Sequence, residues 1–292
     1  MAVNKKYIIG IDIGGSKIIA VLVKGALPAG RQGKIFHKIK NPTPQNRKEF
    51  FSVLQTMIGE LIKKAGGRKN IKGIGCGLPG ALDLKRGIVL HATNIRILNG
   101  FNIKNWLTKK FNYSVRIDND ARCFTRGEYL WGAGKNYQNI IGMTLGTGIG
   151  GGIIINGKMF YGNGSAGEVG HMINGEMYLE DLAIKDIKNF GFSDPLEAYE
   201  FARKGNKKAK EAFNKMSKHL GIGIANLVNI LDPEAIVIGG GIAGASKFFL
   251  PKTKQIMEKF IVSPKSRKNV KIIIGNLGEN AGAIGAAALF LE

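Results

Sequence analysis

The hydrophobic positions of the chain fall into two kinds of run. Short apolar runs bounded by glycine, proline or asparagine indicate β-strands, whereas apolar residues spaced three and four apart indicate amphipathic helices. The predicted strands are 7–13, 18–23, 34–40, 71–76, 113–117, 139–145, 153–160, 234–238 and 270–274. The predicted helices are 47–65, a short helix within 101–111, 121–131, 195–203, 207–230, 251–260 and 281–291. Strands that alternate with helices in this way are typical of α/β proteins.

The same order of elements occurs twice along the chain. Each half opens with a strand, a glycine-rich turn and a second strand, and each continues into alternating helices and strands. Such a repeat predicts two α/β lobes of one design with a cleft between them. We place the N-terminal lobe at residues 1–118 and the C-terminal lobe at 119–280, and we expect the last helix, 281–292, to join the N-terminal lobe.

Two segments have the composition of loops. Residues 25–32 hold glycine and proline and are longer than a hairpin needs, so we expect a surface insertion there. Residues 161–191 read as one long polar loop in the second half.

The first glycine turn is Asp12-Ile-Gly-Gly-Ser-Lys17. Gly14 and Gly15 allow a ligand to approach the backbone, and Ser16 can donate a hydrogen bond. Lys17 can neutralise phosphate charge, although a lysine that starts a strand is also often only solvated. Asp12 cannot bind phosphate directly and indicates a Mg²⁺ ion with its water shell.

The second glycine turn, Gly146-Thr-Gly-Ile-Gly-Gly151, satisfies the pattern G-x-G-x-x-G. A dinucleotide site needs a helix directly after that pattern, whereas residues 153–155 are strand material. The kinase motifs H-R-D and D-F-G and the P-loop are absent from the sequence. The pattern therefore predicts a hairpin tip at which Gly146, Thr147 and Gly148 present backbone N–H groups to phosphate. A third glycine cluster, Gly239, Gly240 and Gly241, follows a buried strand and suits a flat ligand such as adenosine.

A cluster of short polar side chains, Asp118-Asn119-Asp120, lies between a strand and a helix. In open α/β sheets ligands bind beyond the carboxyl ends of the strands, which favours a functional role. All three residue types are also good helix N-caps, so the alternative is that one residue caps the helix and the others are solvated.

The composition is that of an ordinary globular protein with an unusual charge. The 292 residues are 44% hydrophobic and 22% charged, and the formal net charge is +22. The lysines and arginines form small scattered clusters without interleaved aromatic residues, which favours a lysine-rich surface over a dedicated nucleic-acid site. The uncharged stretch 138–157 is too rich in glycine for a membrane helix. We therefore expect no specific nucleic-acid partner and no membrane.

The two cysteines, Cys76 and Cys123, are far apart and form no metal-binding spacing. They are typical of a reducing compartment. No N-terminal segment resembles a signal peptide, and we expect a cytoplasmic protein. We also expect a homodimer.

These motifs, in this order, resemble the ROK family of sugar kinases and repressors in the actin/hexokinase-like superfamily. The resemblance covers nearly the whole chain. It is carried by Asp12 to Lys17, Gly77-Leu-Pro-Gly80, Asn94, Asn119-Asp120, Leu145 to Gly152, Glu168-x-x-His171, Ile222 to Pro233 and Ile238 to Gly241. It implies an α/β fold with two ribonuclease H-like lobes, as in actin-like ATPases, around a central cleft.

The resemblance also implies roles for particular residues. Asp120 would be the catalytic base for a sugar hydroxyl. The sugar would contact Gly80, Asn94, Asn119, Glu168, His171 and Glu180. The two glycine turns would hold phosphate, and Gly239 to Gly241 the nucleotide.

The chain departs from the family at one point. Most members have a zinc site that uses the histidine of E-x-G-H and a C-x-C-G-x-x-G-C segment. Here the segment after His171 contains no cysteine, and Glu180 matches only by its place before Asp181. We therefore expect no structural zinc.

Together these observations predict an ATP- and Mg²⁺-dependent hexose kinase of the glucokinase type. One alternative is a sugar-sensing regulator. The family's repressors carry a helix-turn-helix ahead of the first strand, and only residues 1–6 precede Tyr7, so we expect no such module. The other alternative is an N-acylhexosamine kinase.

Overall fold

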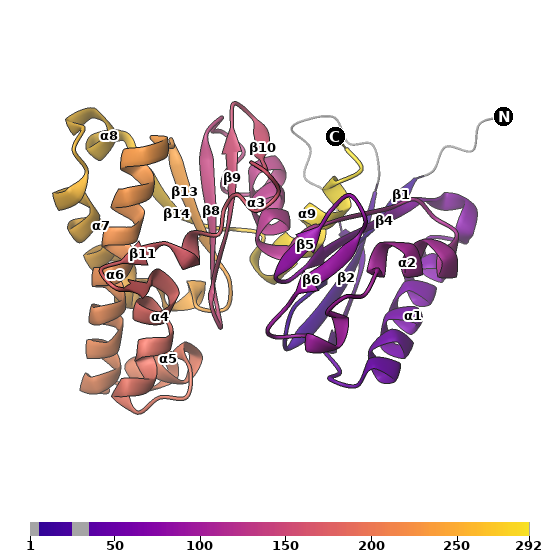
Figure 1. Cartoon of the computed structure of the whole chain (residues 1–292), viewed down its shortest axis with the longest axis horizontal. Coiled ribbons are helices and arrows are strands. Elements are labelled where there is room, and N and C mark those ends of the chain that lie inside the picture. Colours follow the sequence, from indigo (N-terminus) through magenta and orange to yellow (C-terminus); the bar gives the residue numbers. More distant parts are fainter. Residues whose placement is uncertain (1–5, 25–34, 292) are drawn as a thin grey trace. The chain divides into compact units, whose positions relative to one another are not determined.

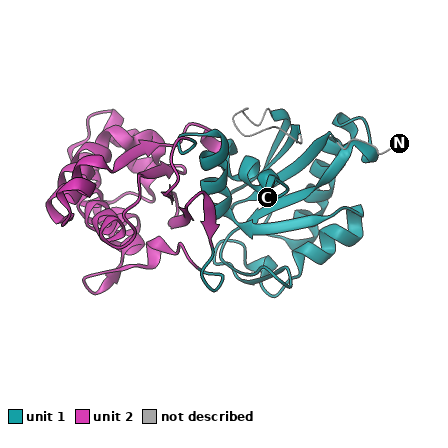
Figure 2. Cartoon of the chain, turned by 90° about the horizontal axis from the view of Figure 1, so that it is seen from above, with its two compact units in different colours: residues 1–135, 161–165, 280–292 teal, residues 136–160, 166–279 magenta. Residues whose placement is uncertain are grey.

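The computed structural model describes residues 6–24 and 35–291. The chain divides into two compact units, shown in separate colours in Figure 2. The first holds residues 1–135, 161–165 and 280–292, and the second holds 136–160 and 166–279. The expected insertion at 25–32 lies outside the described residues. The division falls later than the boundary that we expected at 118/119, so the helix that follows belongs to the first unit.

The first unit is built on a five-stranded sheet in the order β3-β2-β1-β4-β7. Its strands are β1 (Tyr7–Ile13), β2 (Lys17–Lys24), β3 (Ile35–Pro42), β4 (Ile71–Leu78) and β7 (Val115–Asn119). Its helices are α1 (Arg47–Lys64), α2 (Ile103–Phe111), α3 (Asp120–Trp131) and α9 (Ala281–Ala288). Strands β1, β4 and β7 are parallel, whereas β2 and β3 are antiparallel additions at one edge.

Alternation along β1 gives this sheet two buried faces. On one face, Ile9 and Ile11 pack with Phe50 of α1 and Leu107 of α2. Figure 1 shows these two helices beside the sheet. On the other face Gly10 lies directly under α9, because a Cβ there would be 2.0 Å from the Ala283 carbonyl oxygen. A residue with a side chain at position 10 would push α9 off the sheet.

Helix α3 packs closely on α9. A Cβ on Gly285 would be 1.7 Å from the carbonyl oxygen of Cys123, so the two helix backbones touch at this point. This contact is the physical reason that α3 groups with the first unit rather than with the residues that follow it in sequence.

The second unit repeats the same topology with the order β10-β9-β8-β13-β14. Its strands are β8 (Ile140–Leu145), β9 (Ile149–Ile155), β10 (Lys158–Phe160), β13 (Ala235–Gly239) and β14 (Lys271–Ile274). Its helices are α4 (Leu179–Ala183), α5 (Pro195–Arg203), α6 (Lys207–Leu231), α7 (Ser246–Phe260) and α8 (Pro264–Asn269). Buried residues of β8 and β13, such as Met143 and Ile238, pack with Phe213 and Leu220 of α6 and with Phe249 of α7. The two-lobed α/β fold and the internal repeat are confirmed.

The structure also contains elements that the sequence pattern missed. A small hairpin, β5 (Ala81–Asp83) and β6 (Ile88–His91), follows β4. The expected polar loop at 161–191 is wrong as a description, because it contains α4 and the hairpin β11 (Ile173–Asn174) and β12 (Met177–Tyr178). Leu179 of α4 is completely buried in the core of the second unit, which fixes this segment against α6.

Candidate active site

The first unit brings three candidate positions into one row across its parallel strands. Asp12 on β1 pairs with Gly77 on β4, and Gly77 pairs with Asp118 on β7. The carboxyl ends of parallel strands meet at one edge, and in open α/β sheets that edge binds ligands. Asp12 and the segment 118–120 therefore lie together although more than a hundred residues separate them in sequence.

Asp118 is buried and does not face solvent. Its Oδ1 receives the Arg122 Nε at 2.6 Å, and its Oδ2 receives the Arg126 Nη1 at 3.0 Å and the Tyr161 hydroxyl at 3.0 Å. Arg122 also donates to the carbonyl oxygen of Gly164 at 3.1 Å. The alternative in which Asp118 is solvated is wrong. Its carboxylate is the centre of a buried ionic network that ties α3 to residues 161–164.

Asn119 is the N-cap of α3. Its Oδ1 accepts hydrogen bonds from the backbone N–H groups of Ala121 and Arg122, at 2.9 and 3.2 Å. Its Nδ2 donates to the carbonyl oxygen of Gly80 at 3.3 Å. The Asn119 side chain thus caps α3 and also bonds to Gly80. Together these hydrogen bonds fix the orientation of Asn119 directly before Asp120.

Asp120 begins α3 and is partly exposed. Its Oδ1 accepts from the backbone N–H of Ala121 at 2.8 Å. Burial and then the nearby charge of Asp120 raise the pKa of Asp12 to about 7, and Lys17 opposes this rise. The first unit therefore gathers two carboxylates whose charges repel each other. Hard cations prefer carboxylate oxygens as ligands, so this pair fits the Mg²⁺ that accompanies a nucleotide.

The tip of the β1–β2 hairpin has free donors. The N–H of Gly14 donates to the Lys17 carbonyl oxygen, and the Gly14 carbonyl accepts from Thr43 Oγ1 at 2.6 Å. Within 6–24 and 35–291 we find no acceptor for the N–H groups of Gly15 and Ser16. Asn94 lies against this tip, because a Cβ on Gly15 would be 2.9 Å from the Asn94 Cβ.

The tip of the β8–β9 hairpin has the same character in the second unit. The N–H of Gly146 donates to the Gly148 carbonyl oxygen at 2.9 Å. Among the described residues no group accepts from the N–H of Thr147 or Gly148. Each unit thus presents a short turn with two open backbone donors, which is an arrangement that holds anionic oxygens.

Glu180 supports this second tip from below. Its Oε2 accepts from the N–H of Ile149 at 3.1 Å, and its Oε1 pairs with Lys185 Nζ at 2.7 Å. Hydrogen bonds to Asp181 and then to Glu180 raise the pKa of Lys185. Both oxygens of Glu180 therefore have partners in the protein, which a sugar ligand would have to share.

Glu168 and His171 flank the same hairpin. They lie at the short 3₁₀ turn Val169–His171, and Gly170 packs on β9, since a Cβ there would be 2.2 Å from the Ile149 carbonyl oxygen. His171 Nδ1 is 3.4 Å from Glu168 Oε2, and both side chains are about half exposed. The His171 ring also meets Tyr178 edge to face, with centroids 5.2 Å apart.

The third glycine cluster lies at the end of β13, beside the last residue of β8. Gly240 has φ +88°, and a Cβ there would be 2.3 Å from the Leu145 carbonyl oxygen, so position 240 requires glycine. Gly239 ends β13, and Gly241 is exposed beside Leu196 of α5, whose side chain is 50% exposed. An exposed leucine beside bare backbone is a suitable surface for a flat apolar ring.

The predicted residues therefore form two groups. The first unit holds Asp12, Gly14, Gly15, Ser16, Lys17, Gly80, Asn94, Asn119 and Asp120, and the second holds Gly146, Thr147, Gly148, Glu168, His171, Glu180, Gly239, Gly240 and Gly241. Sequence reasoning missed Arg122, Arg126 and Tyr161. The available signal was the spacing of Arg122 and Arg126 by four residues on one face of the predicted helix that follows Asp118.

Two properties of the described residues concern metal ions and membranes. No group of three or more histidine, cysteine, aspartate or glutamate side chains is arranged to hold a metal ion in this part of the chain. None of the helices formed by these residues has the length and apolar character that spanning a membrane requires.

The repeated α/β units and their glycine hairpins define a two-lobed protein of the actin-like ATPase class. The chain belongs to the ROK family, whose sequence model matches residues 8–183 and 185–292. It is 32% identical to a glucokinase of Halalkalibacterium halodurans over 98% of this chain and 95% of that protein. It is 31% identical to a xylose repressor of Caldicellulosiruptor bescii over 100% of this chain and 80% of that protein.

Solved structures agree with this assignment. The crystal structure of a ROK family glucokinase from Streptomyces griseus, in complex with glucose and AMPPNP, superposes with a TM-score of 0.82 at 27% identity. That match covers 97% of this chain and 98% of the other. Solved ROK family structures with this fold thus include a glucokinase and a transcriptional regulator.

Proposed function

We propose that this protein transfers the terminal phosphoryl group of ATP to a hydroxyl of a glucose-like hexose, with Asp120 as the general base. The observation that carries the proposal is that Asp12 and Asp120 lie on either side of Gly77 at one sheet edge: Asp12 pairs with Gly77, and a Cβ on Gly77 would be 3.5 Å from the Asp120 Cα. Similarity to a protein named glucokinase over 98% of the chain supports it.

Asp120 has the properties that a base for a sugar hydroxyl needs. Phosphoryl transfer leaves little covalent work for the protein, so positioning and charge stabilisation dominate. A hydroxyl is a poor nucleophile, and a carboxylate that accepts its proton as the new P–O bond forms removes that limit. Asp120 is partly exposed and anchored through its own N-terminal turn, whereas Asp118 is enclosed by two arginines.

The sugar would lie against the residues that surround Asp120. Asn119 and Gly80 are already joined by a hydrogen bond, and Asn94 lies beside Gly15. We assign Glu168 and His171 to the sugar as well, because their side chains are exposed at one edge of the β8–β9 hairpin. The support for direct contact between Glu180 and the sugar is smaller, because its contacts with Gly148 and Ile149 already explain its position.

ATP would use the two glycine hairpins and the third glycine cluster. The open N–H groups of Gly15, Ser16, Thr147 and Gly148 suit phosphate oxygens, and Lys17 adds positive charge. The exposed surface of Gly241 and Leu196 suits adenine. Bound Mg²⁺ would supply charge neutralisation to the phosphates, and Asp12 would face it through water.

Two free, buried cysteines accord with a reducing compartment, so we also propose a cytoplasmic location. We also propose that the protein is a homodimer. Measurement of its molecular mass in solution tests this.

The deciding experiment measures ADP release with a panel of hexoses, N-acetylhexosamines and pentoses. We expect turnover with glucose or a near relative. In Asp120→Asn we expect kcat to fall at least about a hundredfold, because loss of a general base costs on the order of a hundred to ten thousand fold. Sugar binding by calorimetry should weaken only modestly. Glu200→Gln, an exposed side chain in α5, is the control.

Other outcomes of this experiment favour the alternatives. Sugar binding without turnover in the wild type would favour a sugar-sensing regulator, in line with the similarity to a xylose repressor. A preference for N-acetylated sugars would favour an N-acylhexosamine kinase. Full turnover in Asp120→Asn would refute the assignment of the base.

A further inference from the structure

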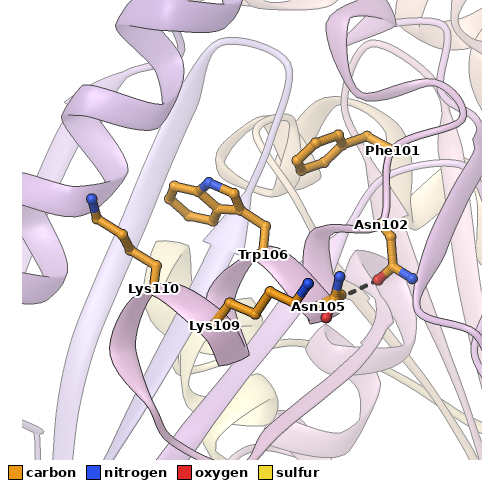
Figure 3. Close-up of a pocket in the computed structure, with 6 residues that line it drawn as sticks. All are labelled: Phe101, Asn102, Asn105, Trp106, Lys109 and Lys110. Atoms are coloured by element: carbon orange, nitrogen blue, oxygen red, sulfur yellow. Dashed lines mark hydrogen bonds between the residues drawn. The ribbon is translucent and has the colours of Figure 1, made fainter.

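Helix α2 of the first unit bears a pocket that the proposed kinase site does not use. It has a volume of about 400 Å³ and is lined by Phe101, Asn102, Asn105, Trp106, Lys109 and Lys110. Figure 3 shows the Trp106 ring between the Phe101 ring and the Lys110 side chain in this view. The volume lies within the range of pockets that hold small organic groups.

The helical period explains why these residues share one face. Asn102 is the N-cap, and positions 105, 106, 109 and 110 follow at three, four, seven and eight residues. Ile103, Leu107 and Phe111 form the opposite face and are buried in the core. Trp106 lies at the margin of that core, where it packs against Phe51 of α1 and stays partly exposed.

The aromatic rings of the pocket are held from below. Phe51 of α1 touches both, with centroids 4.9 Å from Phe101 and 4.4 Å from Trp106. Phe101 and Trp106 remain partly exposed. No described residue accepts a hydrogen bond from the Trp106 indole N–H. The pocket thus offers fixed, partly open π-faces and a free donor.

The rim of the pocket is positively charged. Lys109 and Lys110 are exposed, and neither forms an ion pair with any carboxylate of residues 6–24 and 35–291. The Arg47 guanidinium lies 4.5 Å above the centre of the Phe101 ring. These cations belong to a chain with a net charge of +22. The expectation that no aromatic residue accompanies the lysine clusters is wrong here, because Trp106 precedes Lys109 and Lys110 by one helical turn.

We propose that this pocket binds single-stranded nucleic acid, with one base stacked on Trp106 and the adjoining phosphates alongside Lys109 and Lys110. Stacking on an aromatic ring combined with a cationic rim is the physical basis of single-strand binding without sequence preference. A duplex keeps its bases stacked inside and cannot offer one to Trp106. An acidic peptide supplies negative charge for Lys109 and Lys110 but carries no flat ring beside that charge to stack on Trp106.

The chain contains two tryptophans, which makes Trp106 its own reporter. Trp131 is buried in α3 and can be replaced by phenylalanine. In Trp131→Phe, titration with a twelve-residue oligoadenylate should quench the fluorescence of Trp106. An abasic deoxyribose-phosphate strand of equal length should quench much less. Equal quenching by the two strands would overturn the stacking proposal.

Variants separate stacking from charge when binding of a labelled strand is followed by anisotropy. Trp106→Leu keeps an apolar side chain above Phe51 but removes the π-face, and Kd should rise roughly 5- to 150-fold. Trp106→Phe should lose less. Thermal melting checks that each variant is folded, and Kd values are compared only between variants that melt like the wild type.

The two lysines are tested through salt dependence. Removing two phosphate contacts by Lys109→Ala with Lys110→Ala should reduce the slope of log K against log salt by about 1.4. Lys207→Ala with Lys208→Ala is the matched control, because it removes two adjacent exposed lysines from α6 in the other unit. Equal effects of both pairs, or wild-type affinity in Trp106→Leu, would overturn the site and indicate a diffuse basic surface. Competition by an acidic peptide but not by unlabelled strand would replace nucleic acid with a protein partner.

Discussion

Arg126 Nη1 lies 3.0 Å from Asp118 Oδ2, and the two side chains are only 2% and 1% exposed. The second carboxylate oxygen is taken by Arg122 Nε at 2.6 Å. One buried carboxylate thus balances two buried guanidinium groups from a single helix. Removal of one member of a buried pair is costly, because the remaining charge has no solvent.

This relationship predicts a stability defect. Asp118→Ala should lower the free energy of unfolding by about 3–5 kcal/mol, as measured by urea denaturation. Asp118→Asn keeps two of the hydrogen-bond geometries and should lose less. Glu200→Gln breaks an exposed contact with Arg203 at 3.4 Å and should change stability by less than about 1 kcal/mol. Unchanged stability in Asp118→Ala would show that the network adds nothing.

The same contrast applies to activity. The Asp118 carboxylate is buried and bonded to protein groups, so a ligand cannot reach it. Asp118→Asn should therefore reduce turnover far less than Asp120→Asn. Both variants should be assayed below the melting temperature of the weaker one. A larger loss of kcat in Asp118→Asn than in Asp120→Asn would reverse the assignment of the base.

Sequence periodicity predicted most of the regular elements because their core faces are uniform. Residues 195–203 were predicted as a helix with the bounds that α5 has, and 47–65 differs from α1 by one residue. The register of Asp12, Gly77 and Asp118 was not visible in the sequence, because it depends on pairing between strands far apart in the chain. The burial of Asp118 was missed for a related reason, since its partner Tyr161 is contributed by another segment.

Other misses had a readable signal. Trp106 with Lys109 and Lys110 follows helical spacing, and a check of the polar face of α2 would have found them. The segment 161–191 was predicted as a loop because glycine and polar residues interrupt its apolar positions. Leu179 and Ile184 nevertheless supply enough buried surface to fix α4. Composition predicts the average environment of a segment but not the one or two side chains that anchor it.

The pKa of Asp12 predicts a pH-dependent stability. Burial and Asp120 raise that pKa to about 7 in the folded protein, above the ordinary 3.8. Between these values folding takes up a proton, so the contribution of Asp12 to stability falls as pH rises. Asp12→Asn removes the charge. Without Mg²⁺ or nucleotide, its melting temperature should exceed that of the wild type at pH 8 and match it at pH 5. A difference that does not change with pH would contradict the raised pKa.

The metal content of the protein is a separate prediction. The purified chain should hold no stoichiometric zinc, because Cys76 and Cys123 are buried in the first unit and burial raises the pKa of both thiols. Thiolates are the form that binds zinc. Elemental analysis that finds about one zinc per chain would refute this. Chelators should still stop phosphorylation by removing Mg²⁺ from the nucleotide.

Alanine substitutions at two glycines of the β8–β9 turn should distinguish an effect on ATP binding from an effect on stability. A Cβ on Gly146 would meet no atom within 4 Å, so Gly146→Ala should leave the melting temperature unchanged. The added methyl would occupy space that phosphate needs to approach the backbone, and KM for ATP should rise. A Cβ on Gly148 would lie 2.5 Å from Glu180 Oε2, which Ile149 and Lys185 hold in place.

Gly148→Ala should therefore displace Glu180 and lower the free energy of unfolding by about 1–3 kcal/mol, the usual cost of overpacking. The pair is measured by thermal melting of the ligand-free protein and by ATP titration at saturating sugar. Equal melting temperatures for both variants would show that Glu180 is free to move. An unchanged KM for ATP in Gly146→Ala would place the phosphates elsewhere, because the open space at that position would then have no ligand to exclude.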